Sequence, residues 1–243
     1  MVVTVRGEIA LKKPKQWTWF DANLANITAL INGKIVRYDL KRLYHIHRVY
    51  EIKRGRIQRL SKHKPITAER LMEKYSRRER NRAEDFMHKS TTEIAKELSE
   101  KGSGAILGNL KNIKGRVLRR SKDLNRKLSK RNARTFQSML EYKLKWLGLP
   151  VKYVNSARSS KACPVCRATL VAYRGGLVKC KKCGLLLDRD VVAVLNLQMW
   201  GSGVMMGKRL VDRDLHLPMK VYQPRTPHSW ILSATSPTTT ARF

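Results

Sequence analysis

Four cysteines within one 21-residue window are the residues whose spacing most directly indicates chemistry in this chain. They form two C-x-x-C pairs separated by thirteen residues: Cys163 with Cys166, and Cys180 with Cys183. Zn²⁺ prefers four tetrahedral thiolates, and a C-x-x-C turn lets two sulfurs reach one ion. Short β-prone runs on either side of Gly175-Gly176 complete the pattern of a zinc ribbon. The sequence therefore predicts one structural zinc ion, in a closed site whose folding depends on the metal.

Three aspartates stand beside apolar segments in a chain that is poor in acids. Asp21 follows the aromatic run 17–20, and Asp188 and Asp190 open an apolar helix directly after the cysteine module. A helix start favours Asp as an N-cap, which is one interpretation of Asp190. A turn or strand-end role is the corresponding interpretation of Asp21. The residues alone leave these structural roles and a role in chemistry open.

The charge of the chain points to a polyanionic partner. Of 243 residues, 52 are Lys or Arg and 18 are Asp or Glu, which gives a formal net charge of +34. Nucleic acid is the commonest polyanion that such an excess serves, with a ribosome-associated or anionic-surface protein as the alternative. No run approaches the roughly 18 apolar residues of a membrane span, and the clustered cysteines do not suit a secreted disulfide scaffold. We expect a cytoplasmic, nucleoid-associated protein with no membrane partner.

The remaining pattern predicts an α/β protein. Three β-prone runs come first, and Asn32-Gly33 between the second and third is a strong hairpin signal. Helical periodicity follows over 43–60, 68–101, 135–147 and 190–200, and short strands are expected at 104–110 and 151–154. From about residue 223 the chain is rich in Pro, Ser and Thr, which indicates disorder.

Several segments, taken in order, resemble the TnpB-like (OrfB-type) insertion-sequence proteins, whose nuclease domain is related to that of type V CRISPR effectors. Asp21, Asn23 and Asn26 resemble the first nuclease motif of that family. A helix of the form N-R…D-x-x-H-K-x-S is matched by Asn81, Arg82, Asp85, His88, Lys89 and Ser90. Further matches are Asn125 to Leu128, Tyr142-Lys143, Gly148, and Ser159-Ser160 before the first cysteine. The third nuclease motif is matched by Asp188, Arg189, Asp190, Ala193 and Asn196.

This resemblance implies an RNase H-like (RuvC-type) mixed sheet with helical insertions and an inserted four-Cys zinc ribbon. It implies a metal-dependent DNA endonuclease in which three carboxylates hold two Mg²⁺ ions, with Asp21 and Asp190 as catalytic residues. The Glu of the second motif is replaced here by Gly108, so we expect impaired cleavage. Glu97 and Glu141 are candidate substitutes by proximity along the chain. Family members also carry a module before the first motif, so the resemblance implies an N-terminally truncated member.

Three basic surfaces are expected to contact phosphates, with little sequence preference and strong salt dependence. The residues assigned to this contact are Arg78, Arg82, His88, Lys89, Lys114, Arg119, Arg120, Arg126 and Lys127. The resemblance implies DNA and a guide-like RNA as partners, in a setting of transposition and DNA recombination. A DNA- or RNA-binding regulator with a silenced nuclease site, and a zinc-ribbon RNA-processing protein, are the alternatives.

We expect the chain to consist of four parts. Residues 1–158 form the first part of the nuclease domain, and residues 159–187 form the zinc ribbon. Residues 188–205 return to the nuclease domain as its last helix, and residues 206–243 form a largely disordered tail.

Overall fold

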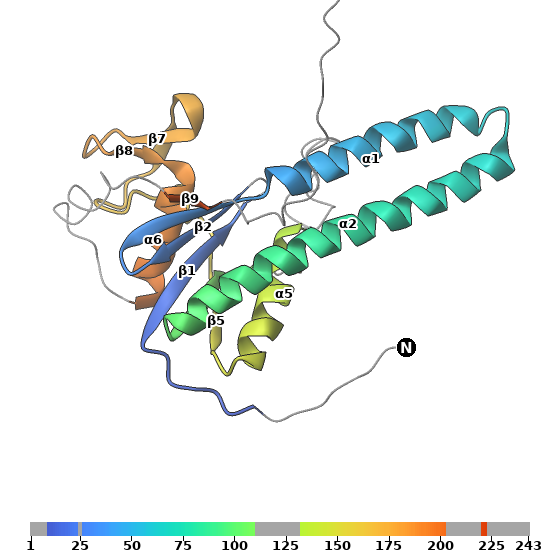
Figure 1. Ribbon diagram of the computed structural model, residues 1–243. Coiled ribbons are helices and arrows are strands. Elements are labelled where there is room, and N and C mark those ends of the chain that lie inside the picture. The colour runs from blue at the N-terminus through green and yellow to red at the C-terminus, as the bar shows by residue number, and fades with distance from the viewer. Residues whose placement is uncertain (1–8, 24–25, 110–131, 203–219, 223–243) are drawn as a thin grey trace, which may run out of the picture.

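A computed structural model describes residues 9–23, 26–109, 132–202 and 220–222 of the chain. Its larger sheet has the strand order β5-β4-β1-β2-β3-β9, in which only β2 runs against its neighbours. This mixed sheet with helices on both faces confirms the predicted α/β class (Figure 1).

The first three strands form a meander: β1 (Gln16–Ala22), β2 (Asn26–Ile31) and β3 (Lys34–Asp39). Asn32 and Gly33 connect β2 to β3 with φ values of 49° and 73°, the backbone that a two-residue hairpin turn of type I′ requires. The tight turn sets the register, which pairs Thr28 with Arg37, while β1 pairs Asp21 with Thr28.

Two parallel strands, β4 (Ser103–Gly108) and β5 (Val151–Val154), extend the sheet beyond β1. All six residues of β4 are buried, as expected for a strand that is covered on both faces. Gly102 ends the preceding helix with a φ of 59°, which explains why the helical pattern stops there.

The two faces of the sheet bury separate apolar cores. One core contains Phe20 and Leu107 and packs against the helices α2 (Pro65–Glu100) and α5 (Asn132–Trp146). The other contains Trp19 and Ile106 and packs against α6 (Arg189–Ser202). Because neighbouring residues of a strand point to opposite faces, Asp21 and Gly108 lie on the α6 side.

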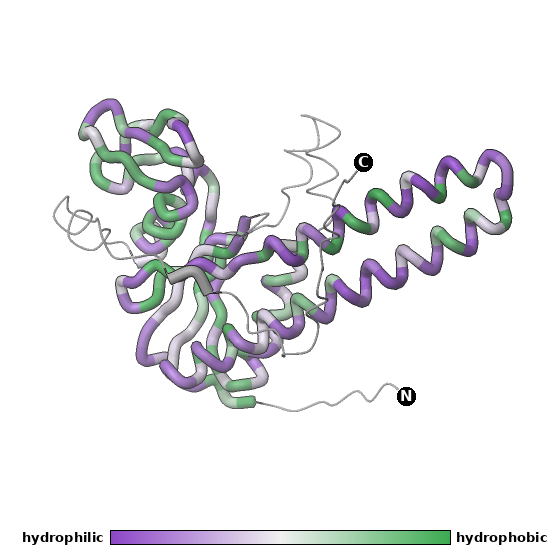
Figure 2. Tube along the Cα trace, turned by 45° about the horizontal axis from the view of Figure 1, so that its top comes forward, coloured by the Kyte–Doolittle hydropathy of each residue, from purple (hydrophilic) through white to green (hydrophobic). Residues whose placement is uncertain are grey.

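Helices α1 (Lys41–Leu60) and α2 form a long hairpin that extends well beyond the sheet (Figure 1). Much of this hairpin is hydrophilic (Figure 2), and residues 41–82 contain 15 Lys or Arg against 4 Asp or Glu. Between the helices, the buried Glu79 pairs with His47 at 2.7 Å and also with Arg54. These contacts fasten the two helices together partway along the hairpin.

The cysteine module forms a separate three-stranded sheet of β6 (Leu170–Ala172), β7 (Leu177–Cys180) and β8 (Leu186–Asp188). The short 3₁₀ turn Arg174–Gly176 joins the first two strands. The third strand is absent from the sequence-based expectation. It pairs with β7 and leads directly into α6, so it carries the ribbon into the last helix.

Parts of the sequence-based prediction fall outside the described residues. These include most of the basic segment 111–134 and most of the tail. Within the tail, Lys220–Tyr222 form β9, which pairs in parallel with β3.

Candidate functional site

Asp188, and not Asp190, caps helix α6. Its Oδ1 accepts the backbone N–H groups of Asp190, at 2.8 Å, and Val191, at 3.3 Å. This satisfies donors that a helix start leaves without partners. The N-cap interpretation of Asp190 is therefore wrong, and the Asp190 carboxylate is available for other contacts.

Asp21 and Asp190 converge on the α6 side of the sheet although 169 residues separate them along the chain. Asn26 donates to Asp190 Oδ2 at 3.2 Å, and Asn23 donates to Asp21 Oδ2 at 3.0 Å. The pKa of Asp21 is raised to about 6, chiefly by burial, with a smaller contribution from the charge of Asp190 and opposing effects of Asn23 and Arg189. Two acids in such mutual repulsion are typical of a site that takes a cation.

A row of side-chain positions crosses the sheet at this point. Gly108 follows Leu107, the register partner of Phe20, so the row contains Gly108 on β4, Asp21 on β1, Thr28 on β2 and Arg37 on β3. All four positions have the same parity as the core that faces α6. The second-motif position is thus the strand neighbour of Asp21, which is where a third carboxylate would reach the same cation.

Arg37 at the far end of this row contacts the acids of α6. Its Nη2 lies 2.9 Å from Asp188 Oδ1 and 4.0 Å from Asp190 Oδ2. Sequence reasoning missed this residue because it belongs to no motif. The Asn32-Gly33 turn could have indicated its position, because a two-residue turn there sets the register that pairs Arg37 with Thr28, the neighbour of Asp21.

Neither proposed substitute for the missing Glu reaches the acid pair. Glu97 accepts from Tyr38 at 2.9 Å and pairs with Lys101, and Glu141 accepts from Tyr153 at 2.6 Å and pairs with Lys145. Both glutamates belong to α2 and α5, which cover the opposite face of the sheet. The suggestion that either one replaces the second-motif acid is therefore wrong.

The residues at the acid pair do not fit the two-Mg²⁺ arrangement. Among the described residues, the four cysteines are the only group of three or more potential ligand side chains that come together. Asp21 and Asp190 provide two carboxylates, and the Arg37 guanidinium already stands beside the second of them. The donor set suits one hard divalent cation, with water completing its coordination.

The four cysteine sulfurs form a candidate metal site. All four lie within 4.8 Å of one another, with Cys163 3.5 Å from Cys183 and Cys166 3.4 Å from Cys180. Tetrahedral Zn²⁺ with Zn–S bonds of about 2.3 Å would place sulfurs about 3.8 Å apart, so the spacing fits such an ion. Burial raises the pKa of Cys163 to about 12, so metal binding there must displace a proton.

Both knuckles of the ribbon have the same backbone shape. The residue after each pair, Arg167 and Gly184, has a positive φ of 60° and 77°, and its N–H bonds to the carbonyl of the first cysteine at 3.0 Å. Asn196 of α6 is fully buried and donates to the carbonyls of Ser159, at 2.6 Å, and Ala162, at 2.7 Å. This third-motif residue therefore ties the ribbon entry to the helix that carries Asp190.

The described basic residues of the expected interface lie along α2. Arg78 and Arg82 are exposed residues, and their guanidinium carbons lie over the rings of Tyr75 and Tyr50, at 5.8 Å and 5.9 Å from the ring centres. His88 contacts Tyr142 of α5, and Lys89 pairs with Asp85 at 2.8 Å. The other residues assigned from the sequence lie outside the described residues: Lys114, Arg119, Arg120, Arg126 and Lys127.

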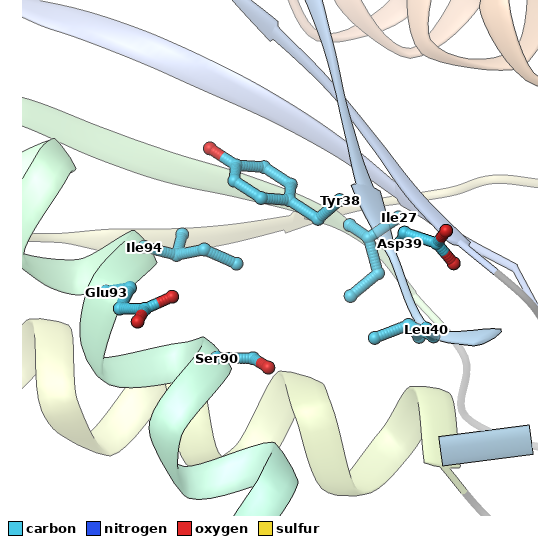
Figure 3. Close-up of a pocket in the computed structure, with 7 residues that line it drawn as sticks. All are labelled: Ile27, Tyr38, Asp39, Leu40, Ser90, Glu93 and Ile94. Atoms are coloured by element: carbon cyan, nitrogen blue, oxygen red, sulfur yellow. The ribbon is translucent and has the colours of Figure 1, made fainter. Parts of the chain in front are cut away.

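Two cavities among the described residues lie away from the acid pair. One, between the ends of β2 and β3 and helix α2, is lined by Ile27, Tyr38 and Ile94 among others and measures about 10 Å³ (Figure 3). That volume accommodates about one water molecule. A hollow of about 250 Å³ lies beside the hairpin, at His47, Glu79 and Thr135. No helix among the described residues has the length and apolar character to cross a bilayer.

The fold is that of the Cas12f proteins. The solved Cas12f1–sgRNA–target DNA complex matches 78% of this chain and 51% of the Cas12f1 chain, at 22% identity and a TM-score of 0.54. A CRISPR–Cas12f ternary complex matches 81% of this chain and 41% of its own, at 19% identity and a TM-score of 0.60. Residues 134–197 match the family model described as the Cas12f1-like TNB domain.

Similarity to curated relatives identifies the family of the chain within the proteins that share this fold. TnpB-like protein MJ0751 of Methanocaldococcus jannaschii is 39% identical over 183 residues, which cover 73% of this chain and 66% of the relative. TnpB-like protein MJ0012 of the same organism is 35% identical over 140 residues, or 58% of this chain and 62% of the relative. TnpB-like protein aq_aa05 of Aquifex aeolicus is 31% identical over 178 residues, or 68% and 54%. The chain belongs to the TnpB-like family, and it spans 54% to 66% of the length of these relatives.

Proposed function

We propose that this chain is a transposon-encoded, nucleic-acid-binding protein related to RNA-guided DNA endonucleases, with impaired cleavage. The observation that supports the proposal is the convergence of Asp21 and Asp190 beside Gly108, the position at which the family resemblance implies the third acid. Asp21 and Asp190 are the residues that would hold a catalytic Mg²⁺ ion, and the four cysteines would hold a structural Zn²⁺ ion.

The weakness of the nuclease site follows from ligand number. Two-metal hydrolysis needs carboxylates that clamp both the attacking water and the leaving oxygen. Here two carboxylates and an adjacent guanidinium replace the three carboxylates that the resemblance implies. Residual activity therefore rests on the two acids alone.

Nucleic acid binding rests on the charge of the α1–α2 hairpin and of the ribbon. The exposed Arg78 and Arg82 are pre-oriented by stacking on tyrosines, which lowers the entropy cost of contact with phosphate. The two solved Cas12f structures are an sgRNA–target DNA complex and a ternary complex, and by analogy we assign DNA and a guide-like RNA as partners of this chain. A location at the nucleoid accords with such partners.

A regulator that acts by occupying DNA or RNA is the second candidate function. Gly108 favours it, because a protein that works by occupancy does not need the third acid. The retained Asp21 and Asp190, with their supporting Asn23 and Asn26, favour a site that still takes a cation.

Salt-dependent binding tests the proposal. We expect the full chain to bind labelled single-stranded DNA and RNA with an affinity that falls steeply between about 50 mM and 200 mM salt, because phosphate contacts release counterions. The double variant Arg78→Gln/Arg82→Gln should reduce the slope of log K against log salt by about 1.4 on single strands. Lys13→Gln/Lys34→Gln removes the same charge from exposed positions outside the hairpin and is the matched control. Equal slopes for both variants would refute the hairpin as the interface.

A further inference from the structure

Arg37 brings a positive charge into the acid pair from a strand that carries none of the nuclease motifs. It lies two strands away from Asp21, in the same row of the sheet, and pairs with Asp188 at 2.9 Å. Only 21% of its side chain is exposed. Within the described part of the chain neither its Nε nor its Nη2 has a partner in hydrogen-bond geometry, so charge attraction is what holds the guanidinium at these acids.

The charges of this cluster suit one divalent cation. Asp21, Asp188 and Asp190 contribute three negative charges, and Arg37 neutralises one of them, which leaves the charge of a single divalent ion. The Oδ1 atom of Asp188 is already engaged by the α6 backbone and by Arg37, so Asp188 holds both the helix start and the guanidinium beside the acid pair. Arg189 also approaches Asp190, at 3.9 Å, but its side chain is 61% exposed and its charge is screened by water.

We propose that Arg37 is a resident counter-cation that takes the place of a second metal ion, so that the acid pair binds one divalent cation and binds it weakly. The inference rests on the proposed assignment of Asp21 and Asp190 as cation ligands. An arginine stays charged at every pH at which the protein is folded, so it opposes the approach of a divalent ion permanently. Coulomb repulsion over a few ångströms changes the affinity for such an ion by about tenfold even with water-like screening.

Mn²⁺ binding to the zinc-loaded full chain tests this role without reference to nuclease activity. Titration calorimetry and the electron paramagnetic resonance signal of free Mn²⁺ give affinity and stoichiometry. The wild type is expected to bind one Mn²⁺, and Arg37→Gln is expected to bind Mn²⁺ about tenfold more tightly or to accept a second ion. Arg42→Gln removes the same charge from the exposed start of α1 and should match the wild type. Arg37→Lys keeps the charge and should also stay near the wild type.

Several results would overturn the proposal. One is a stoichiometry of two Mn²⁺ ions on the wild type. Another is an Mn²⁺ affinity of Arg37→Gln that equals or falls below that of the wild type. A third is an equal gain in Mn²⁺ affinity in Arg37→Gln and Arg37→Lys. If Arg37→Gln does not fold, the wild-type stoichiometry and the Arg37→Lys affinity still decide. Unchanged Mn²⁺ affinity in Asp21→Ala would show that the acid pair is not the cation site. The nucleic-acid binding part of the proposed function is tested independently, by its salt dependence.

Discussion

Restoring an acid at position 108 is the perturbation that most directly probes the geometry of the acid pair. Gly108 ends β4 on the face of the sheet that carries Asp21, so a side chain introduced there points toward α6 and the acids. A Cβ at this position would lie only 2.9 Å from Ser156 Cβ and 3.3 Å from its Oγ. Gly108→Glu alone would therefore force the loop after β5 to move.

A glutamate at position 108 has a cost in stability and a gain in Mn²⁺ affinity. Overpacking of this kind costs about 1–3 kcal/mol of stability, and Ser156→Gly removes both of the atoms responsible. A carboxylate about 4 Å from a divalent ion gains about 2 kcal/mol even at the dielectric constant of water. We therefore expect Gly108→Glu/Ser156→Gly to bind Mn²⁺ about thirtyfold more tightly than Gly108→Gln/Ser156→Gly.

Titration calorimetry of the two double variants isolates the carboxylate, since Glu and Gln have the same size. Thermal melts should give similar midpoints for both, and Gly108→Glu without the second change should melt lower. Equal Mn²⁺ affinity of the Glu and Gln variants would mean that position 108 does not face the acid pair. The assignment of faces to β1 and β4 would then be wrong.

Three further outcomes are expected. Chelation should remove one Zn²⁺ per chain and abolish the ribbon signals in NMR spectra, because the ribbon buries little apolar surface of its own; metal-free protein with unchanged spectra would contradict this. Asn196→Ala should lower the free energy of unfolding by about 1–3 kcal/mol, measured with denaturant, since two carbonyls lose their donor. In metal-free protein the pKa of Asp21 is about 6 in the native state and 3.8 in the unfolded state, so the native state binds the proton more tightly. The free energy of unfolding of the wild type, relative to that of Asp21→Asn, should therefore fall as the pH rises from about 4 to 6 and should be constant above that range. A constant difference across that range would show that Asp21 is not buried beside Asp190.

The larger elements could be predicted because local patterns determine them. Asn32-Gly33 specified both a turn and a register, and Gly102 and Gly148 end helices with positive φ values of 59° and 75°. The four cysteines converge as their spacing predicts. Each of these features depends on residues close together in the chain.

The missed features depend on contacts between distant segments. Strand β8 is a three-residue strand that exists through its pairing with β7, and no periodicity is detectable over so short a run. Arg37 reaches Asp188 across the sheet, a contact that requires the register of three strands and the position of α6 together. The exclusion of Glu97 and Glu141 likewise depends on which face of the sheet their helices cover.

At the start of α6, the preference of helix N-caps for Asp correctly predicts that an aspartate caps the helix but does not identify which of the two aspartates does so. Helix starts favour Asp, and the sequence offered two. Backbone geometry assigns the cap to Asp188, two residues before the site residue. Asp188 therefore supports the start of the helix, and Asp190, two residues later, is the candidate metal ligand.

Parallel binding and cleavage measurements on one labelled single-stranded DNA distinguish a binder with a weakened acid pair from an efficient nuclease. We expect the wild type and Asp21→Ala to bind this DNA with similar affinity and similar salt dependence. In physiological Mg²⁺ we expect the wild type to cleave little faster than Asp21→Ala. Strong Mg²⁺-dependent cleavage that Asp21→Ala abolishes would contradict the proposed impairment, because it would mean that two carboxylates beside Arg37 suffice for efficient hydrolysis.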